Sequence, residues 1–213
     1  MDEKAHWESI YRTKSPAEVS WFQSESRVSL ELIRRAEPRL YASIIDVGGG
    51  ASVLVDNLLS AGYRKLTVLD LSAAALELSR LRIGIAGDEV TWQVANILTS
   101  DLPVGTIDLW HDRAVFHFLT NPLDRERYVA KVRRAVRPGG HVLIATFAED
   151  GPTRCSGLEV ARYKAESLHS VFGSDFELLE QVREEHLTPW GARQSFVYCL
   201  CCFDPKQSAK SME

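Results

Sequence analysis

The sequence has few cysteines, and their spacing argues against a metal site. Three of the four, Cys199, Cys201 and Cys202, lie within the apolar stretch FVYCLCCF, and Cys155 stands alone. This arrangement lacks the paired C-x-x-C spacing of a zinc site. We therefore expect buried thiols that behave as small apolar side chains, and no bound metal. A thiol site that handles soft elements remains an alternative.

Long apolar runs and an excess of basic charge are also missing. No run approaches the roughly 18 apolar residues of a membrane span, and the charged start MDEKAHWESIY has no apolar core of the signal-peptide type. We expect a cytoplasmic protein without membrane contact. The formal net charge is −4, which disfavours a broad nucleic-acid-binding surface. Small molecules or a local protein motif are the expected partners, and nothing indicates an oligomeric state.

What is present is a regular alternation of strand-like and helix-like segments. The expected strands are 42–47, 65–72, 89–97, 106–112, 141–147, 175–187 and 193–203, and the expected helices are 25–36, 52–62, 73–84, 121–140 and 157–173. Alternation of this kind predicts a doubly wound α/β fold, with a mostly parallel sheet and helices on both faces. We expect a single domain over 1–204, with an N-terminal lid segment 1–24 and a flexible tail 205–213.

The turn after the first predicted strand, DVGGGAS, is rich in glycine. It lacks the lysine of a phosphate-binding P-loop, and Val53 stands where a dinucleotide turn has its third glycine. Asp70 ends the next strand, 20 residues after Gly50, where a carboxylate accepts hydrogen bonds from both hydroxyls of a ribose. The third strand ends in VANI, whose Asn96 and Ile97 are placed to face an adenine. A nucleoside site with little phosphate contact fits these features better than a plain surface turn.

These motifs, with IDLWHDRAVFHFL and RPGGHVLIATF, resemble the class I S-adenosylmethionine-dependent methyltransferases over about residues 44–147. The resemblance implies a seven-stranded sheet whose last strand is antiparallel, S-adenosyl-L-methionine as cofactor and S-adenosyl-L-homocysteine as product. The segment HWESIY…EVSWFQ is similar to the entry segment of a bacterial small-methyltransferase subgroup, itself similar to thiopurine- and tellurite-type enzymes and to some protein-lysine methyltransferases.

The resemblance also implies roles for single residues. The cofactor-binding positions would be Asp46, Gly48 and Gly50 at the methionine part, Asp70 at the ribose, Leu71, Asn96 and Ile97 at the adenine, and Trp21 as a cover. Many family members have Asp where Asn96 stands. An asparagine still accepts from the adenine amino group and also donates to a ring nitrogen.

The segment LWHDRAVFHF ends the fourth predicted strand beside the expected sulfonium. Its candidate catalytic residues are Asp112, which would orient a substrate, and His111 and His117, whose ordinary pKa lies near neutrality. Arg113 would bind an anionic substrate, while Cys155 and Trp190 are further candidates for substrate contact. The alternative is structural: Asp112 and Arg113 brace the loop, and the histidines pack.

The predicted function is transfer of a methyl group to a small-molecule nucleophile, such as a thiol or a metalloid oxyanion, by in-line displacement. Protein-lysine methylation is the alternative. A nicotinamide-dependent oxidoreductase would need a Tyr-x-x-x-Lys pair, but Tyr128 is followed by Lys131, one position too soon. A non-catalytic cofactor-binding module is disfavoured because the motif set is intact.

Overall fold

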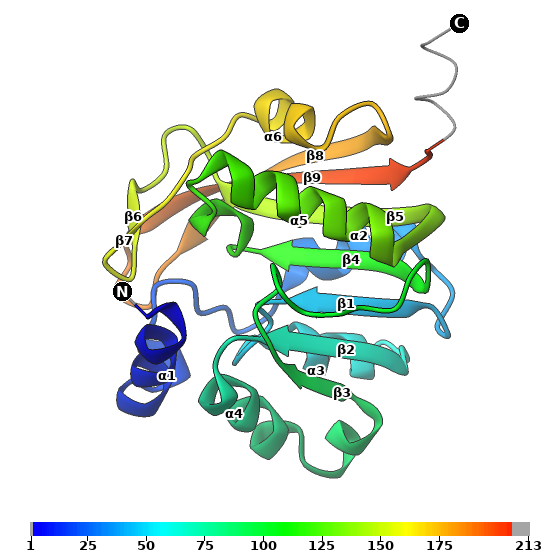
Figure 1. Cartoon of the computed structure of the whole chain (residues 1–213). Coiled ribbons are helices and arrows are strands. Elements are labelled where there is room, and N and C mark those ends of the chain that lie inside the picture. The colour runs from blue at the N-terminus through cyan, green and yellow to red at the C-terminus, as the bar shows by residue number, and fades with distance from the viewer. Residues whose placement is uncertain (1, 206–213) are drawn as a thin grey trace, which may run out of the picture.

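A seven-stranded sheet lies at the centre of this computed structural model, which describes residues 2–205 (Figure 1). The strand order is β3-β2-β1-β4-β5-β9-β8. Its strands are β1 (Ser43–Val47), β2 (Lys65–Asp70), β3 (Thr91–Val94), β4 (Ile107–Arg113), β5 (Val136–Phe147), β8 (Phe176–Leu187) and β9 (Arg193–Phe203). The first five pair in parallel, and β9 is antiparallel to both of its neighbours. The predicted sheet, with its antiparallel last strand, is confirmed.

Helices cover both faces of the sheet, as predicted. They are α1 (Glu3–Thr13), α2 (Arg27–Ala36), α3 (Leu54–Ser60), α4 (Ala73–Ile83), α5 (Pro122–Ala135) and α6 (Ala165–Phe172). Apolar side chains of α2, α3 and α4 pack with Ile44 in one core cluster, and those of α5 and α6 pack with Ile45 in the other. Adjacent strand residues point to opposite faces, so one short apolar strand supplies both clusters.

Local signals in the sequence fix several helix ends. The Ser72 side chain accepts from the Ala75 N–H at the start of α4, which ends at Gly84 with a φ of 64°. The Asn121 side chain caps α5, whose first residue is Pro122. Hydroxyl and amide side chains satisfy free N–H groups at a helix start, and glycine adopts the left-handed conformation at its end.

Two predicted helices are shorter than expected. The segment 157–173 is helical only in α6, because β6 (Arg154–Cys155) and β7 (Leu158–Glu159) form a small hairpin before it. Ser156 and Gly157 form its turn with φ values of 52° and 80°, which a right-handed helix does not allow. The other helix ends at Ala135, and β5 already begins at Val136.

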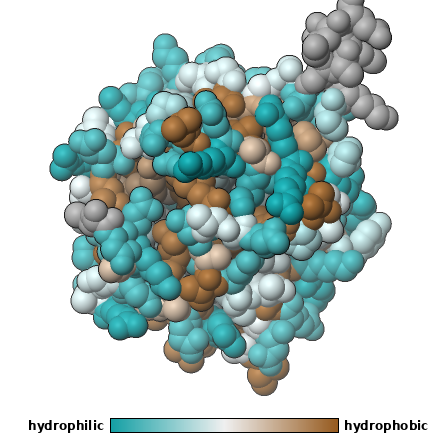
Figure 2. All heavy atoms as spheres, in the orientation of Figure 1, coloured by the Kyte–Doolittle hydropathy of each residue, from teal (hydrophilic) through white to brown (hydrophobic). Residues whose placement is uncertain are grey.

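The carboxyl ends of the parallel strands meet at one edge of the sheet, where α1 and the β6–β7 hairpin also lie (Figure 1). Figure 2 shows hydrophilic side chains interspersed with smaller apolar areas on this face of the molecule. Within residues 2–205, no helix is long and apolar enough to cross a membrane. The predicted tail 205–213 lies outside the described residues except for its first residue.

Candidate active site

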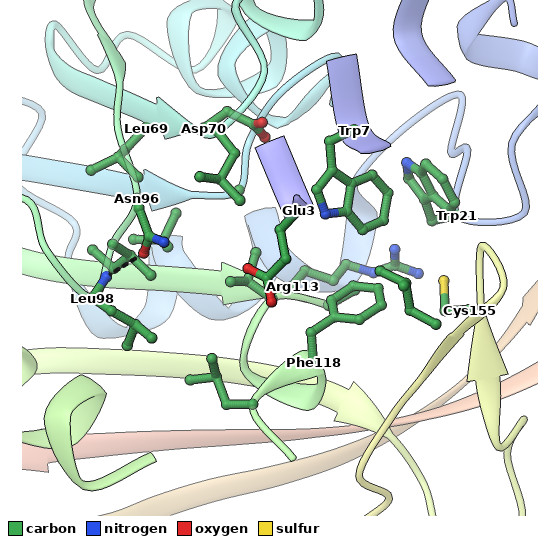
Figure 3. Close-up of a pocket in the computed structure, with 18 of the residues that line it drawn as sticks. Glu3, Trp7, Trp21, Leu69, Asp70, Asn96, Leu98, Arg113, Phe118 and Cys155 are labelled. Atoms are coloured by element: carbon green, nitrogen blue, oxygen red, sulfur yellow. Dashed lines mark hydrogen bonds between the residues drawn. The ribbon is translucent and has the colours of Figure 1, made fainter. Parts of the chain in front are cut away.

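A cavity of about 310 Å³ opens at the carboxyl edge of the sheet (Figure 3). Residues at the ends of β1, β2, β3 and β4 form its floor, and α1, Trp21, η3 (Phe116–Phe118) and the β6–β7 hairpin form its other walls. It holds most of the predicted cofactor residues, namely Trp21, Gly48, Asp70, Leu71, Asn96 and Ile97. Its volume lies at the lower end of the range for ligand sites.

Asp70 presents a buried carboxylate to this cavity. Its Oδ1 accepts the Ser72 N–H at 2.8 Å. Burial raises the pKa of Asp70 to about 7, and the nearby carboxylates of Asp46 and Glu8 act in the same direction. Neutral donors such as ribose hydroxyls would stabilise the ionised form, because hydrogen bonds to a charged group favour that charge. The site therefore suits a vicinal diol.

Each of the three glycines in the turn after β1 leaves room for a different neighbouring side chain. A Cβ at Gly48 would lie 2.0 Å from Val115 Cγ2, and one at Gly50 would lie 2.7 Å from Asp70 Oδ2. Gly50 lines neither cavity described here and instead leaves room for Asp70. Gly49, which the motif did not single out, leaves room for Asp46, since its Cβ would lie 2.5 Å from Asp46 Oδ2.

Asn96 and Ile97 line the cavity, and Asn96 lies at the opposite end from Cys155 of the hairpin (Figure 3). Asn96 Oδ1 accepts the Leu98 N–H at 2.8 Å, so this oxygen already has a donor (Figure 3). The amide nitrogen lies on the cavity side in the same view. The Asn96 amide nitrogen is therefore better placed to donate to a ring nitrogen of an adenine than its oxygen is to accept from the adenine amino group.

Aromatic side chains from the N-terminal segment cover the cavity. The Trp7 ring meets Trp21 edge-to-face at a centroid distance of 5.7 Å and Phe118 at 5.2 Å. Trp21 Nε1 donates to the Tyr11 hydroxyl at 3.1 Å. The Glu8 carboxylate joins α1 to the start of α4, accepting from the Ser72 hydroxyl and from the Ala74 N–H. The predicted lid segment thus lies over the site, and its movement remains a prediction.

None of the three predicted catalytic residues lines the main cavity, and two of them line neither cavity. Asp112 is fully buried and accepts from the N–H groups of Val115 and Phe116 and from the Tyr128 hydroxyl. Burial raises its pKa to about 6. Its hydrogen bonds brace the turn after β4, so the structural alternative describes Asp112 better than a catalytic role.

His117 is also fully buried, and its ring packs on Phe118 and Phe147 at centroid distances of 4.5 and 4.7 Å. Neither ring nitrogen has a hydrogen-bond partner among the described residues. Burial lowers its pKa to about 3, and the charge of Arg113 acts in the same direction. A neutral ring enclosed in the core is out of reach of a substrate, so a role as proton acceptor does not fit this placement.

The third candidate, His111, lines a smaller cavity of about 50 Å³ beside the main one. Asp46, Gly48, Gly49 and Arg113 line it too. His111 is only 2% exposed and lies between Asp46 and Ser29. Asp46, predicted at the methionine part of the cofactor, therefore lines the smaller cavity and not the main one.

The substrate candidates fare differently. Arg113 lines both cavities, while its guanidinium contacts the Tyr198 hydroxyl at 2.9 Å and Glu184 at 3.4 Å and stacks over Phe196. Cys155 lines the main cavity, and burial raises its thiol pKa to about 11. Trp190 is 62% exposed in the turn between β8 and β9 and lines neither cavity, so its expected place in the pocket wall is wrong.

The sequence reasoning passed over Glu3 as a site residue, and gave Trp7 and Phe118 no specific role there. Glu3 and Trp7 extend from α1 into the cavity, and Phe118 rises from η3 to meet them (Figure 3). Glu3 and Trp7 fall within the predicted lid segment 1–24, but a single exposed acid carries no pattern that marks it as a site residue. Among residues 2–205, no group of three histidine, cysteine or acidic side chains is placed to hold a metal ion.

The known proteins similar to this chain are methyltransferases. A methyltransferase domain model matches residues 45–144, a little under half of the chain, from β1 into β5. The EEF1A lysine methyltransferase 2 of Danio rerio is 28% identical over 195 residues, covering 84% of this chain and 77% of that protein.

Solved structures share the fold at low identity. One comes from work on the conversion of a disulfide bond into a thioacetal group during echinomycin biosynthesis, with a TM-score of 0.76, 17% identity, and coverage of 99% of this chain and 97% of the other. The N-methyltransferase NodS from Bradyrhizobium japonicum WM9, in complex with S-adenosyl-L-homocysteine, has a TM-score of 0.71 at 14% identity, covering 95% and 99%.

The fold, the glycine turn with Asp70 and the domain match define the chain as an S-adenosylmethionine-dependent methyltransferase of class I. The residues fit this cofactor: the buried carboxylate of Asp70, the apolar side chains of Leu71 and Ile97, and a buried Asp46 oxygen that has no donor in the described part of the chain. When bound, the cofactor supplies an activated methyl group on a sulfonium. The likeness to thiopurine- and tellurite-type enzymes stays a prediction.

Proposed function

We propose that the methyl acceptor is an amine nitrogen, and that a lysine side chain of a protein presents it. The observation that carries this proposal is the charge of the main cavity at its aromatic end. There Glu3 points inward beside Trp7 and Phe118 (Figure 3). A second carboxylate, Glu159, lies at the exposed rim and pairs with Arg154.

The charge balance disfavours an anionic acceptor. Arg113 is the buried cation of this cavity, and Glu184 neutralises it at 3.4 Å. Glu3 therefore leaves a negative charge at the mouth of the cavity, which attracts an ammonium and repels a thiolate or a metalloid oxyanion. An amine is therefore the preferred acceptor, in place of the soft nucleophiles expected from the sequence.

Transfer needs the amine in its neutral form, because an ammonium has no lone pair. The buried side chains Tyr11 and Cys155 keep their protons at neutral pH, since burial raises the pKa of each. The walls supplied by Trp7, Trp21 and Phe118 are apolar and lower the pKa of an entering amine by desolvation. Glu3, exposed at the mouth, attracts the ammonium, and the amine loses its proton to bulk water before it enters the apolar part of the cavity. The protein aligns nitrogen, methyl and sulfur and excludes solvent from them.

The similarity to a named lysine methyltransferase over 84% of the chain supports a protein acceptor. A long, unbranched side chain also suits a narrow aromatic channel. A small-molecule amine is the second candidate. It is favoured by the roof that α1 and the β6–β7 hairpin form over a cavity of only about 310 Å³.

The test is a methyl-transfer screen with methyl-labelled cofactor. The acceptors are purified eEF1A, which is the acceptor named for the Danio rerio relative, a panel of small amines, and a panel of thiols, carboxylates, selenite and tellurite. We expect label on nitrogen, located by mass spectrometry. Labelled lysine supports the first candidate and a labelled small amine the second. Label on thiols or oxyanions alone would refute the amine proposal.

A matched pair of variants tests the charge argument. Glu3→Gln removes the cavity charge, and Glu31→Gln removes an exposed acid on α2 that lines neither cavity. We expect Glu3→Gln to raise KM for the amine about tenfold, as loss of one charge-assisted contact does. Glu31→Gln should leave KM unchanged. Equal KM values for both variants would exclude Glu3 from acceptor binding.

A further inference from the structure

Ser29, His111 and Asp46 form a buried chain of hydrogen bonds beside the small cavity. His111 Nδ1 lies 2.7 Å from Asp46 Oδ1, and His111 Nε2 lies 2.9 Å from Ser29 Oγ. All three residues are at most 4% exposed. A carboxylate only accepts hydrogen bonds, so Nδ1 carries the proton shared with Asp46. The Ser29 hydroxyl forms the hydrogen bond with Nε2 on the other side of the ring.

Only one oxygen of Asp46, Oδ1, takes part in this series of hydrogen bonds. The other, Oδ2, is buried and has no hydrogen-bond partner within residues 2–205. It lies under Gly49, where any Cβ would come within 2.5 Å of it. A buried carboxylate oxygen without a donor costs about 1–3 kcal/mol, so Asp46 is arranged for a donor that arrives with a ligand.

The remaining walls of the small cavity indicate the kind of donor. Arg113, whose charge Glu184 balances at 3.4 Å, lines it together with Asp46, so a guanidinium with further N–H donors and a carboxylate border the same space. An α-amino acid group carries an ammonium and a carboxylate a few ångströms apart and complements such a pair. The cofactor of this enzyme ends in that group, and Gly48 lines both cavities, which makes them neighbours.

We propose that His111 is a positioning residue for cofactor binding. It holds Asp46 by Oδ1 so that Oδ2 faces the ammonium of the cofactor, and Ser29 fixes the orientation of the ring. His111 itself touches neither the methyl group nor the acceptor. The histidine expected to act as a base thus serves the cofactor instead.

The test compares two ligands by calorimetry: S-adenosyl-L-homocysteine, and 5′-methylthioadenosine, which keeps the nucleoside and sulfur but lacks the amino acid. For His111→Leu we expect the affinity for the first ligand to fall about tenfold, the effect of one charge-assisted hydrogen bond, and that for the second to stay within about twofold. His111→Asn places an amide N–H near the Nδ1 position and should restore most of the loss. Ser29→Ala should show a smaller loss, again only for the complete ligand.

A second measurement separates positioning from general damage to the fold. In an Asp46→Asn background, His111→Leu should cause no further selective loss, because residues that act through one another are not additive. Equal losses for both ligands, or an unchanged affinity for S-adenosyl-L-homocysteine, would overturn the proposal. If His111→Leu does not fold, His111→Asn and Ser29→Ala carry the test. No acceptor is present, so the result is independent of the amine proposal.

Discussion

Asp70 and Asp112 are both buried carboxylates at the end of a parallel strand, yet their surroundings give them different roles. Asp112 receives donors from Val115, Phe116 and Tyr128 and has no open side. Asp70 receives the Ser72 N–H and is hydrogen-bonded by the Gly50 backbone, and it still lines the cavity. A strand-end aspartate is recognisable in the sequence, but the number of donors around it depends on the folded turn.

Asp70→Asn should stabilise the protein without ligand while weakening cofactor binding. Burial raises the pKa of Asp70 to about 7 in the folded state, above its unfolded value. Its contribution to stability is therefore full at low pH and is lost as pH rises through 7. We expect the variant to gain about 1–3 kcal/mol in free energy of unfolding at pH 8, the desolvation penalty of such a group. The gain should shrink progressively as the pH falls from 8 and should nearly vanish only below about pH 4, where the carboxyl is protonated in the folded and the unfolded state alike, as urea titrations would show.

The same variant should bind S-adenosyl-L-homocysteine at least about tenfold more weakly, because an amide is a poorer acceptor for two hydroxyls than a carboxylate. The wild-type affinity should rise between pH 6 and pH 8, and that of Asp70→Asn should change less. Unchanged affinity in calorimetry would contradict the ribose role.

Asp112→Ala should act on stability rather than on chemistry. It removes the acceptor for two backbone N–H groups and the Tyr128 hydroxyl, all buried, at a cost of about 3 kcal/mol or more. Calorimetric titration of the folded variant should find an affinity for S-adenosyl-L-homocysteine within about twofold of wild type. A large loss of turnover at wild-type stability would restore the catalytic interpretation.

At the scale of secondary-structure elements, sequence patterns predicted the strands with a regular apolar pattern and the helices that begin at a capping residue. Alternating apolar runs located all seven strands of the sheet, and Ser72 and Asn121 marked helix starts. The β6–β7 hairpin was not predicted, because its strands have two residues each, which is too short for a periodic apolar pattern. The burial of His117 was not predicted either, since only tertiary contacts reveal that Phe118 and Phe147 enclose it.

Helix α1 has no buried residue, so its position depends on a few polar and aromatic contacts. The strongest anchor is Glu8, which accepts from the Ser72 hydroxyl and the Ala74 N–H at the start of α4. An acid at a helix start contributes about 1 kcal/mol. Glu8→Gln should therefore speed dissociation of S-adenosyl-L-homocysteine about fivefold in stopped-flow traces, and should raise hydrogen exchange in α1.

Glu77→Gln on the outer side of α4 is the matched control, because Glu77 is exposed and lines neither cavity. Its dissociation rate should equal that of wild type. If Glu8→Gln also left the rate unchanged, α1 would be a fixed wall of the cavity and not a lid.

At the scale of the whole molecule, a rigid sheet carries the floor of the site, and separate thin elements form its roof. The ends of β1, β2 and β4 are fixed by two core clusters, one on each face of the sheet. Cofactor binding therefore joins α1, the sheet and the hairpin across the cavity. The ligand should raise the stability of the entire fold, since it binds only the native state.

S-adenosyl-L-methionine and S-adenosyl-L-homocysteine should each raise Tm, and NAD should not. At a ligand concentration 100 times Kd the linkage amounts to about 2.7 kcal/mol. For a chain of this size that corresponds to a rise of about 5–10 °C in a thermal scan. NAD carries a pyrophosphate, and Val53 stands where a pyrophosphate-binding turn has its last glycine. The carboxylates of Asp70 and Glu3 also line the cavity and would repel the pyrophosphate. Asp70→Asn should show a smaller shift at the same concentrations. A shift with NAD equal to that with S-adenosyl-L-homocysteine would mean that the cavity recognises only the adenosine half, and the assignment of Asp46 to the amino acid end would then fail with it.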